Sequence, residues 1–156
     1  MRIFYNAIKA SAVYAMALLL AVAPAAAQDR NPVPKVHRLV LQVNSNDLAM
    51  MTLALNNATN VEQYYTSRGE KVDIEVVTFG SGLHMLREDT SPVKLRIKAI
   101  SERTSSISFK ACGNTQENMR KAENKDIPLL KEATVVESGV VRLLERQEQG
   151  WAYVRP

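Results

Sequence analysis

The sequence predicts a three-layer α/β/α domain built on a mainly parallel, five-stranded sheet. The first observation is an alternation of strand-like and helix-like segments that continues from residue 36 to the C-terminus. Each strand is followed by a helical segment, and parallel neighbours need crossover connections of this kind. The second observation is an ordinary composition, with 46% hydrophobic and 23% charged residues in a chain of 156. A chain of this size and composition can bury one substantial core.

The N-terminal segment predicts a signal peptide that takes no part in the fold. Arg2 and Lys9 give it a basic start, residues 15–23 form a short apolar run, and the small residues of APAAAQ follow. We expect cleavage after Ala27. The apolar run is too short, and too soon interrupted by Pro24, for a membrane span of about 20 apolar residues. An uncleaved N-terminal anchor is the alternative.

Cleavage divides the chain into a signal peptide (1–27), an extended tether rich in Asn and Pro (28–35) and an α/β domain (36–156). Two of the 20 basic residues and none of the 16 acidic ones lie in the leader, so the net charge falls from +4 to +2. The remaining charges form no basic stripe with interleaved aromatics, and nucleic acid is therefore not an expected partner. We expect export to a bacterial periplasm, without a stable membrane span.

The first half of the domain predicts two strands around one long helix. VHRLVLQV at 36–43 is rich in β-branched residues and Leu, as in a buried strand. Asn46 or Asp47 can cap the following helix, and Gly69 can end it. Apolar residues at helical spacing within it are Leu48, Met51, Leu55 and Ala58. KVDIEVVTFG at 71–80 predicts a second strand that ends in the glycine turn GSG.

The second half repeats the alternation in shorter pieces. A helix is predicted at 91–103, because Ser91 and Pro92 suit an N-cap and a first turn. The remaining predicted elements are strand 105–112, helix 114–125, strand 133–138, helix 139–150 and strand 151–155.

In open parallel sheets, ligands bind at the carboxyl ends of the strands. The predicted strands end here in four small polar segments: NSND (44–47), GSGLH (80–84), CGNT (112–115) and ESG (137–139). The third of these contains the only cysteine of the chain, Cys112. The sequence therefore places this thiol on the edge of the sheet where a site is expected.

The residues around Cys112 predict an acidic thiol. Asn114, with Glu117 three residues later, forms a capping-box pattern, so a helix N-terminus would lie next to the sulfur and favour the thiolate. Gly113 keeps the turn open, and Lys110 lies on the same strand face by the period of two. We expect Cys112 to be catalytic. The expected lining residues are Lys110, Gly113, Asn114, Thr115, Asn44, Gly80, His84 and Ser138.

Other kinds of site find less support in the sequence. A lone cysteine can equally be a small buried apolar residue. His84 could act as a base toward Cys112 or have no role. Cys112 has no partner for a disulfide, and no cysteine and histidine cluster has the spacing of a metal site. GSG lacks the third glycine of a dinucleotide fingerprint, and no G-x-S-x-G elbow is present.

Four segments together resemble the DsrE/DsrF-like family, relatives of the DsrEFH and TusBCD sulfur-relay proteins. They are FKACGNT, VDIEVVTFGSG, LALNNATNV and the C-terminal VVESGVVRLLERQEQGWAYVRP, and the resemblance covers about residues 36–156. The CGNT element and the C-terminal QGWAYVRP resemble the small, exported, stand-alone branch of this family. The resemblance implies an α/β/α subunit that forms trimers or hexamers. It also implies that Cys112 matches the cysteine that carries sulfur as a persulfide.

These observations lead to three functional hypotheses. The first is a sulfur carrier that uses Cys112 and needs neither a metal nor an organic cofactor, a sulfurtransferase-like protein rather than a conventional enzyme. Its partners would be a sulfur donor or acceptor protein, or a small sulfane-sulfur compound. The second is a non-catalytic oligomeric binding or assembly module with the same fold. The third is a thiol redox partner that forms intermolecular disulfides.

Overall fold

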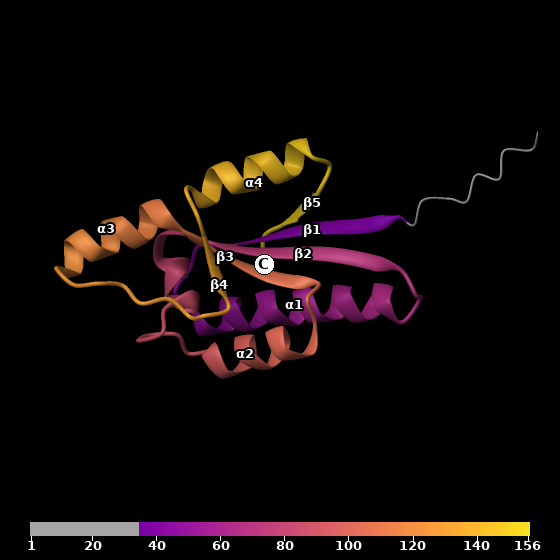
Figure 1. Ribbon diagram of the computed structural model, residues 1–156, viewed down its shortest axis with the longest axis horizontal. Helices are drawn as coiled ribbons and strands as arrows, with labels where there is room; N and C mark the ends of the chain where they lie inside the picture. The colour runs from indigo at the N-terminus through magenta and orange to yellow at the C-terminus, as the bar shows by residue number, and fades with distance from the viewer. Residues whose placement is uncertain (1–34) are drawn as a thin grey trace, which may run out of the picture. The chain divides into compact units, whose positions relative to one another are not determined.

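The computed structural model describes residues 35–156 of the chain. These residues form a five-stranded parallel sheet with helices on both faces (Figure 1). The three-layer α/β/α architecture predicted from the sequence is therefore confirmed. The predicted signal peptide, and all of the predicted tether except Lys35, lie outside the described residues.

The sheet has the strand order β4-β3-β2-β1-β5. Its strands are β1 (Val36–Val43), β2 (Lys71–Thr78), β3 (Ile107–Cys112), β4 (Ala133–Val136) and β5 (Ala152–Val154). The helices are α1 (Leu48–Thr66), the 3-10 helix η1 (Gly80–Leu86), α2 (Lys94–Arg103), α3 (Gly113–Glu123) and α4 (Gly139–Glu148). Within residues 35–156, no helix combines the length and the apolar character that a membrane crossing requires.

The direction of the strand order explains the two helical layers. From β1 to β4 the chain steps in one direction across the sheet, and α1 and α2 cover one face on the way (Figure 1). The chain then returns to the opposite edge, where β5 pairs with β1. Crossovers between parallel strands are right-handed, so the returning helix α4 lies on the other face.

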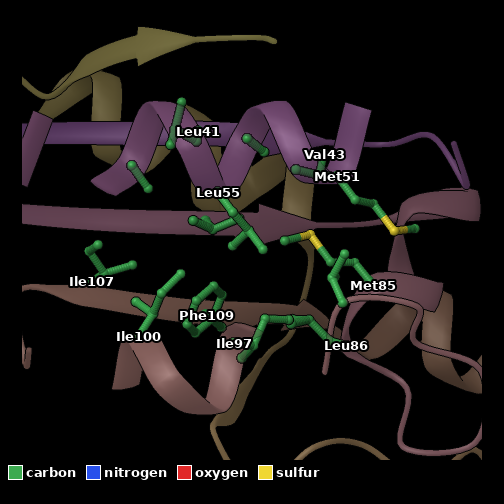
Figure 2. Packing of buried hydrophobic residues seen from close by; sticks show 14 of the residues in the cluster. Leu41, Val43, Met51, Leu55, Met85, Leu86, Ile97, Ile100, Ile107 and Phe109 are labelled. Carbon is green, nitrogen blue, oxygen red and sulfur yellow. The ribbon is translucent and has the colours of Figure 1, made fainter. Parts of the chain in front are cut away.

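The main core lies between the sheet and the layer of α1 and α2 (Figure 2). Phe109 on β3 is buried there, as the alternation of β3 predicts, with Ile107 and Ala111 on the same face. Side chains from α1, η1 and α2 close this core, among them Met51, Leu55, Met85, Leu86, Ile97 and Ile100. This face therefore holds most of the buried apolar surface of the described residues.

Most predicted elements differ from the observed ones by one or two residues at an end, and two differ in a way that has a clear cause. Helix α2 begins at Lys94, not at Ser91, because the Ser91 hydroxyl donates to the Met85 carbonyl at 2.6 Å and fixes a turn before the helix. The predicted glycine turn GSG is the start of the 3-10 helix η1. The predicted cap of α1 is confirmed, since the Asp47 carboxylate accepts from the N–H groups of Ala49 and Met50.

Candidate functional site

Cys112 ends β3 and is itself the N-cap residue of α3. Its Sγ accepts the backbone N–H of Thr115 at 3.4 Å. The expected cap, Asn114, lies inside the first turn of the helix, so that part of the prediction is wrong. Glu117 does not reach back to a cap either, because it pairs with Arg120 and Lys121. The sulfur thus occupies the position that a serine or aspartate oxygen usually takes at a helix N-terminus.

The hydroxyl of Thr115 connects the sulfur to the end of β2. The N–H of Gly80 donates to Thr115 Oγ1 at 3.0 Å, which leaves the hydroxyl proton free to donate to Cys112 Sγ. The loop after β2 therefore fixes the orientation of this hydroxyl. Gly80 and Thr115 were both predicted as lining residues, and the structure joins them by this bond.

A second helix N-terminus reaches the sulfur from the neighbouring strand. Cys112 is in register with Val136 on β4, and the chain enters α4 three residues later. The N–H of Gly139 acts on the sulfur from this side and lowers the pKa of the Cys112 thiol. A methyl group on Gly139 would come within 3.3 Å of Cys112 Cβ, so only glycine allows this close approach without displacement. Ser138 accepts from Val141 N–H and caps α4.

These contacts set the acidity of the thiol. Burial raises the pKa of Cys112, but the Thr115 hydroxyl and the N–H groups of Gly139, Thr115 and Asn114 favour the thiolate, and the net effect lowers the pKa. Lys110, which we expected to lower it, is not among the groups that cause this shift. The thiolate is therefore stabilised by helix N-termini and a hydroxyl. The Cys112 residue is 4% exposed.

A groove of about 460 Å³ lies between the starts of α3 and α4, and Cys112 itself is not among its lining residues. Its lining includes Asn114 from α3, Glu137 and Ser138 before α4, and Val141 and Glu145 on α4. The Asn114 N–H donates to the Glu137 carbonyl at 3.1 Å, so the two helix starts that flank Cys112 are tied together. The groove therefore lies beside the two helix starts that flank the cysteine.

The other predicted lining residues have different partners. The Asn44 carbonyl accepts from the Ser81 hydroxyl at 3.0 Å, which connects the ends of β1 and β2. His84 hydrogen-bonds Thr90 at 2.8 Å, and within residues 35–156 no hydrogen bond joins it to Cys112. Within the same part of the chain, no group of three or more His, Cys, Asp or Glu residues could hold a metal ion.

Gly139 is the site residue that the sequence interpretation did not single out. The signal was present, because a serine and a glycine precede the apolar helix VVRLL. What the sequence lacks is any sign that this helix start lies against Cys112, 27 positions earlier in the chain. That proximity comes from the pairing of β3 with β4.

Replacing Thr115 by valine is expected to raise the pKa of Cys112 by about one unit, because a hydrogen bond to an ionised group is worth about 1.5–3 kcal/mol. The pKa would be measured from the rate of iodoacetamide alkylation as a function of pH. Thr115→Ser keeps the hydroxyl and should stay close to the wild-type profile. An unchanged profile in Thr115→Val would show that the hydroxyl does not stabilise the thiolate.

Comparison with known proteins finds no family model and no curated protein that matches the chain. Among solved structures, it is similar to MTH1491 from Methanobacterium thermoautotrophicum, described as a protein of unknown function. The two share 32% sequence identity with a TM-score of 0.64, over 77% of this chain and 99% of that one. At this identity, and with nearly the whole of MTH1491 matched, the chain belongs to the same protein family as MTH1491.

Proposed function

We propose that this protein is a DsrE/DsrF-like sulfur carrier that holds sulfane sulfur as a persulfide on Cys112. The observation that supports it best is the set of donors around one sulfur atom. The Thr115 N–H donates to Cys112 Sγ at 3.4 Å. The N-termini of α3 and α4 and the Thr115 hydroxyl, which the loop after β2 orients, lower the pKa of this thiol. A thiolate is the species that attacks sulfane sulfur.

The proposed reaction is a sulfur transfer that needs no outside oxidant or reductant. The Cys112 thiolate attacks the outer sulfur of thiosulfate, forms an S–S bond and releases sulfite with the electron pair of the broken bond. The thiolate of a partner then attacks the outer sulfur of the protonated persulfide and takes it as its own persulfide. Cys112 leaves as a thiolate, ready for the next transfer.

The same donors would stabilise the product of the first step. A persulfide anion places its charge on the outer sulfur, and hydrogen bonds from backbone N–H groups favour a negative charge at a helix N-terminus. The groove beside Asn114 and Ser138 offers space for the additional sulfur atom. The protein's own groups can thus perform both steps without a metal or an organic cofactor.

The proposal includes export and self-assembly, as the family resemblance implies. A homotrimer or a homohexamer in a bacterial periplasm would present Cys112 to a small sulfane-sulfur compound or to a donor or acceptor protein. The outer face of α4 supports an assembly, since the exposed side chains of Val140, Val141 and Leu144 form an apolar stripe on this helix.

The test is to incubate the mature protein with thiosulfate or polysulfide and to measure its intact mass. We expect the wild type to gain the mass of one sulfur atom and to lose it on reduction. Cys112→Ser should gain none. A wild type without added sulfur, or a serine variant that gains as much, would contradict the proposal.

A second candidate function is an oligomeric binding or assembly module that does not use the thiol. The burial of Cys112 favours it, because a residue that is 4% exposed packs as a small apolar side chain. Alkylation of the native assembly separates the two functions. A thiol that reacts only after unfolding would support the binding module, and one that reacts in the native state would support the sulfur carrier.

A further inference from the structure

Helix α4, whose N-terminus reaches Cys112, has few apolar contacts with the sheet. Only Gly139 and Leu143 are buried among its residues, and Leu143 packs on Val40 and Val77. Its other apolar side chains, Val140, Val141 and Leu144, are exposed. One leucine does not fix both the position and the rotation of a helix, so other contacts must define where α4 lies.

The other attachment of α4 is ionic and centres on Glu75 in β2. This side chain faces α4 and the residue is 4% exposed. Arg142 donates to both carboxylate oxygens, from Nε at 2.8 Å and from Nη2 at 2.7 Å. Arg146 donates from Nη2 at 2.6 Å, and its guanidinium lies over the Trp151 ring, 4.5 Å from the centroid. Two arginines one helical turn apart are thus held by one buried carboxylate.

Such a contact specifies geometry more strictly than apolar packing does. A bidentate pair between a guanidinium and a carboxylate is directional, and leaving either group unpaired in a buried position is costly. Arg142 follows Gly139 by three residues, or about 4.5 Å along a rigid helix axis. A displacement of Arg142 is therefore transmitted to the N–H of Gly139.

We propose that Glu75 is a positioning residue for the reactive thiol, because its ion pairs with Arg142 and Arg146 hold the N-terminus of α4 against Cys112. The inference rests on the proposed function, since it assigns to this network the task of presenting Gly139 to a sulfur that must ionise. Glu75 itself does not line the groove between α3 and α4, although its partner Arg142 does.

The direction of the pKa change of Cys112 in Glu75→Gln distinguishes a positioning role of Glu75 from a direct effect of its charge. Removal of the negative charge of Glu75, by itself, would lower the pKa of Cys112, because a thiolate forms more easily without a nearby anion. Withdrawal of the Gly139 N–H and of the N-terminus of α4 from the sulfur would raise it. A rise in Glu75→Gln would thus have the sign expected for a displaced α4 and the opposite sign to the direct effect of the lost charge.

The experiment is an alkylation profile of Cys112 against pH in the full mature protein, with iodoacetamide as the probe. Burial raises the pKa of Glu75, but the hydrogen bonds from Arg142 and Arg146 outweigh it and lower the pKa to about 2, so this carboxyl does not titrate in the assay range. We expect Glu75→Gln to raise the pKa of Cys112 and to slow alkylation at pH 7 about three- to tenfold.

Two further variants complete the series. Arg142→Lys keeps the charge but loses the bidentate pair, so it should give a smaller rise and still fold if Glu75→Gln does not. The matched control is Glu62→Gln, which changes another buried glutamate, on α1, whose carboxylate lies 3.6 Å from Arg103. This control should leave the profile unchanged.

The outcomes separate the inference from the proposed function. An unchanged or lowered pKa in both Glu75→Gln and Arg142→Lys would overturn the inference, even if the wild type takes up sulfur from thiosulfate. A raised pKa in these variants, with a wild type that takes up no sulfur, would support the positioning of the thiol and contradict the sulfur carrier.

Discussion

Replacing Gly82 by alanine is expected to destabilise the protein by more than about 3 kcal/mol, the largest effect of any glycine substitution in the described residues. Gly82 lies in η1, directly against the end of β1. An added Cβ would overlap the Val43 carbonyl oxygen, and would lie 2.6 Å from the carbonyl carbon and 2.8 Å from Asn44 Cα. These are backbone atoms, so no side-chain rotation can relieve the overlap. Urea unfolding, monitored by circular dichroism, would measure the loss in the free energy of unfolding.

The matched control for this substitution is Gly69→Ala. Gly69 has a φ of 70°, and nothing lies within 4 Å of an added Cβ. The control therefore reports only the strain of a left-handed backbone, about 1–2 kcal/mol. Equal losses in the two variants would show that the contact of η1 with β1 can relax.

The same substitution is expected to affect the site. Because η1 begins with Gly80, whose N–H orients the Thr115 hydroxyl, a displaced η1 would also disturb the hydrogen bond to Cys112. The pKa of the thiol should rise in any fraction of Gly82→Ala that remains folded. The alkylation profile of Cys112 measures this.

Replacing Arg87 by methionine is expected to lower the midpoint of thermal unfolding by about 10 °C. Arg87 follows η1 and is 1% exposed, yet it carries a full charge. It donates to both oxygens of Asp89, at 2.9 and 2.7 Å, and to Glu123 Oε2 on α3 at 2.9 Å. Helix α3 has no buried residue of its own, so this pairing is a main attachment of the helix that Cys112 caps.

The loss of thermal stability caused by Arg87→Met should depend on pH. The hydrogen bond from Arg87 lowers the pKa of Asp89 and lowers that of Glu123 from about 4.5 to about 2. A carboxyl whose pKa is lower in the folded than in the unfolded protein stabilises the fold. This stabilisation is complete above the pKa of the unfolded protein and is lost as the pH falls through the pKa of the folded protein. The difference between wild type and variant should therefore be full at pH 7 and shrink from about pH 4.5 toward pH 2.

Arg120→Met provides the control on the same helix. Arg120 is exposed and pairs with Glu117, three residues away, and surface pairs of this kind contribute little. Its thermal midpoint should change by no more than about 2 °C. A loss for Arg87→Met that is equally small, or one that does not vary with pH, would contradict the role assigned to the buried arginine.

The elements of the fold could be predicted because the relevant signals are local. The apolar run of β1, the helical spacing of Met51, Leu55 and Ala58, and the Asp47 cap each depend on residues close together in the chain. One prediction of a helix start failed because a side chain bonded the preceding turn and not the helix. Ser91 was expected to begin a helix, but its hydroxyl bonds the Met85 carbonyl, and α2 starts at Lys94.

The sequence by itself determined the alternation of strands and helices, the polar ends of the strands, and the place of Cys112 at one of them. The cap of α3 by Cys112 is also a local contact, although the sequence favoured Asn114 for it. Only the tertiary structure decided that Gly139 approaches the cysteine from the neighbouring strand. It also decided that Glu75, buried in β2, holds the helix that Gly139 begins. The physical reason is that periodicity and capping act over a few residues. The surroundings of the sulfur depend instead on which strands pair and which helix covers which face, and these contacts join residues far apart in the chain.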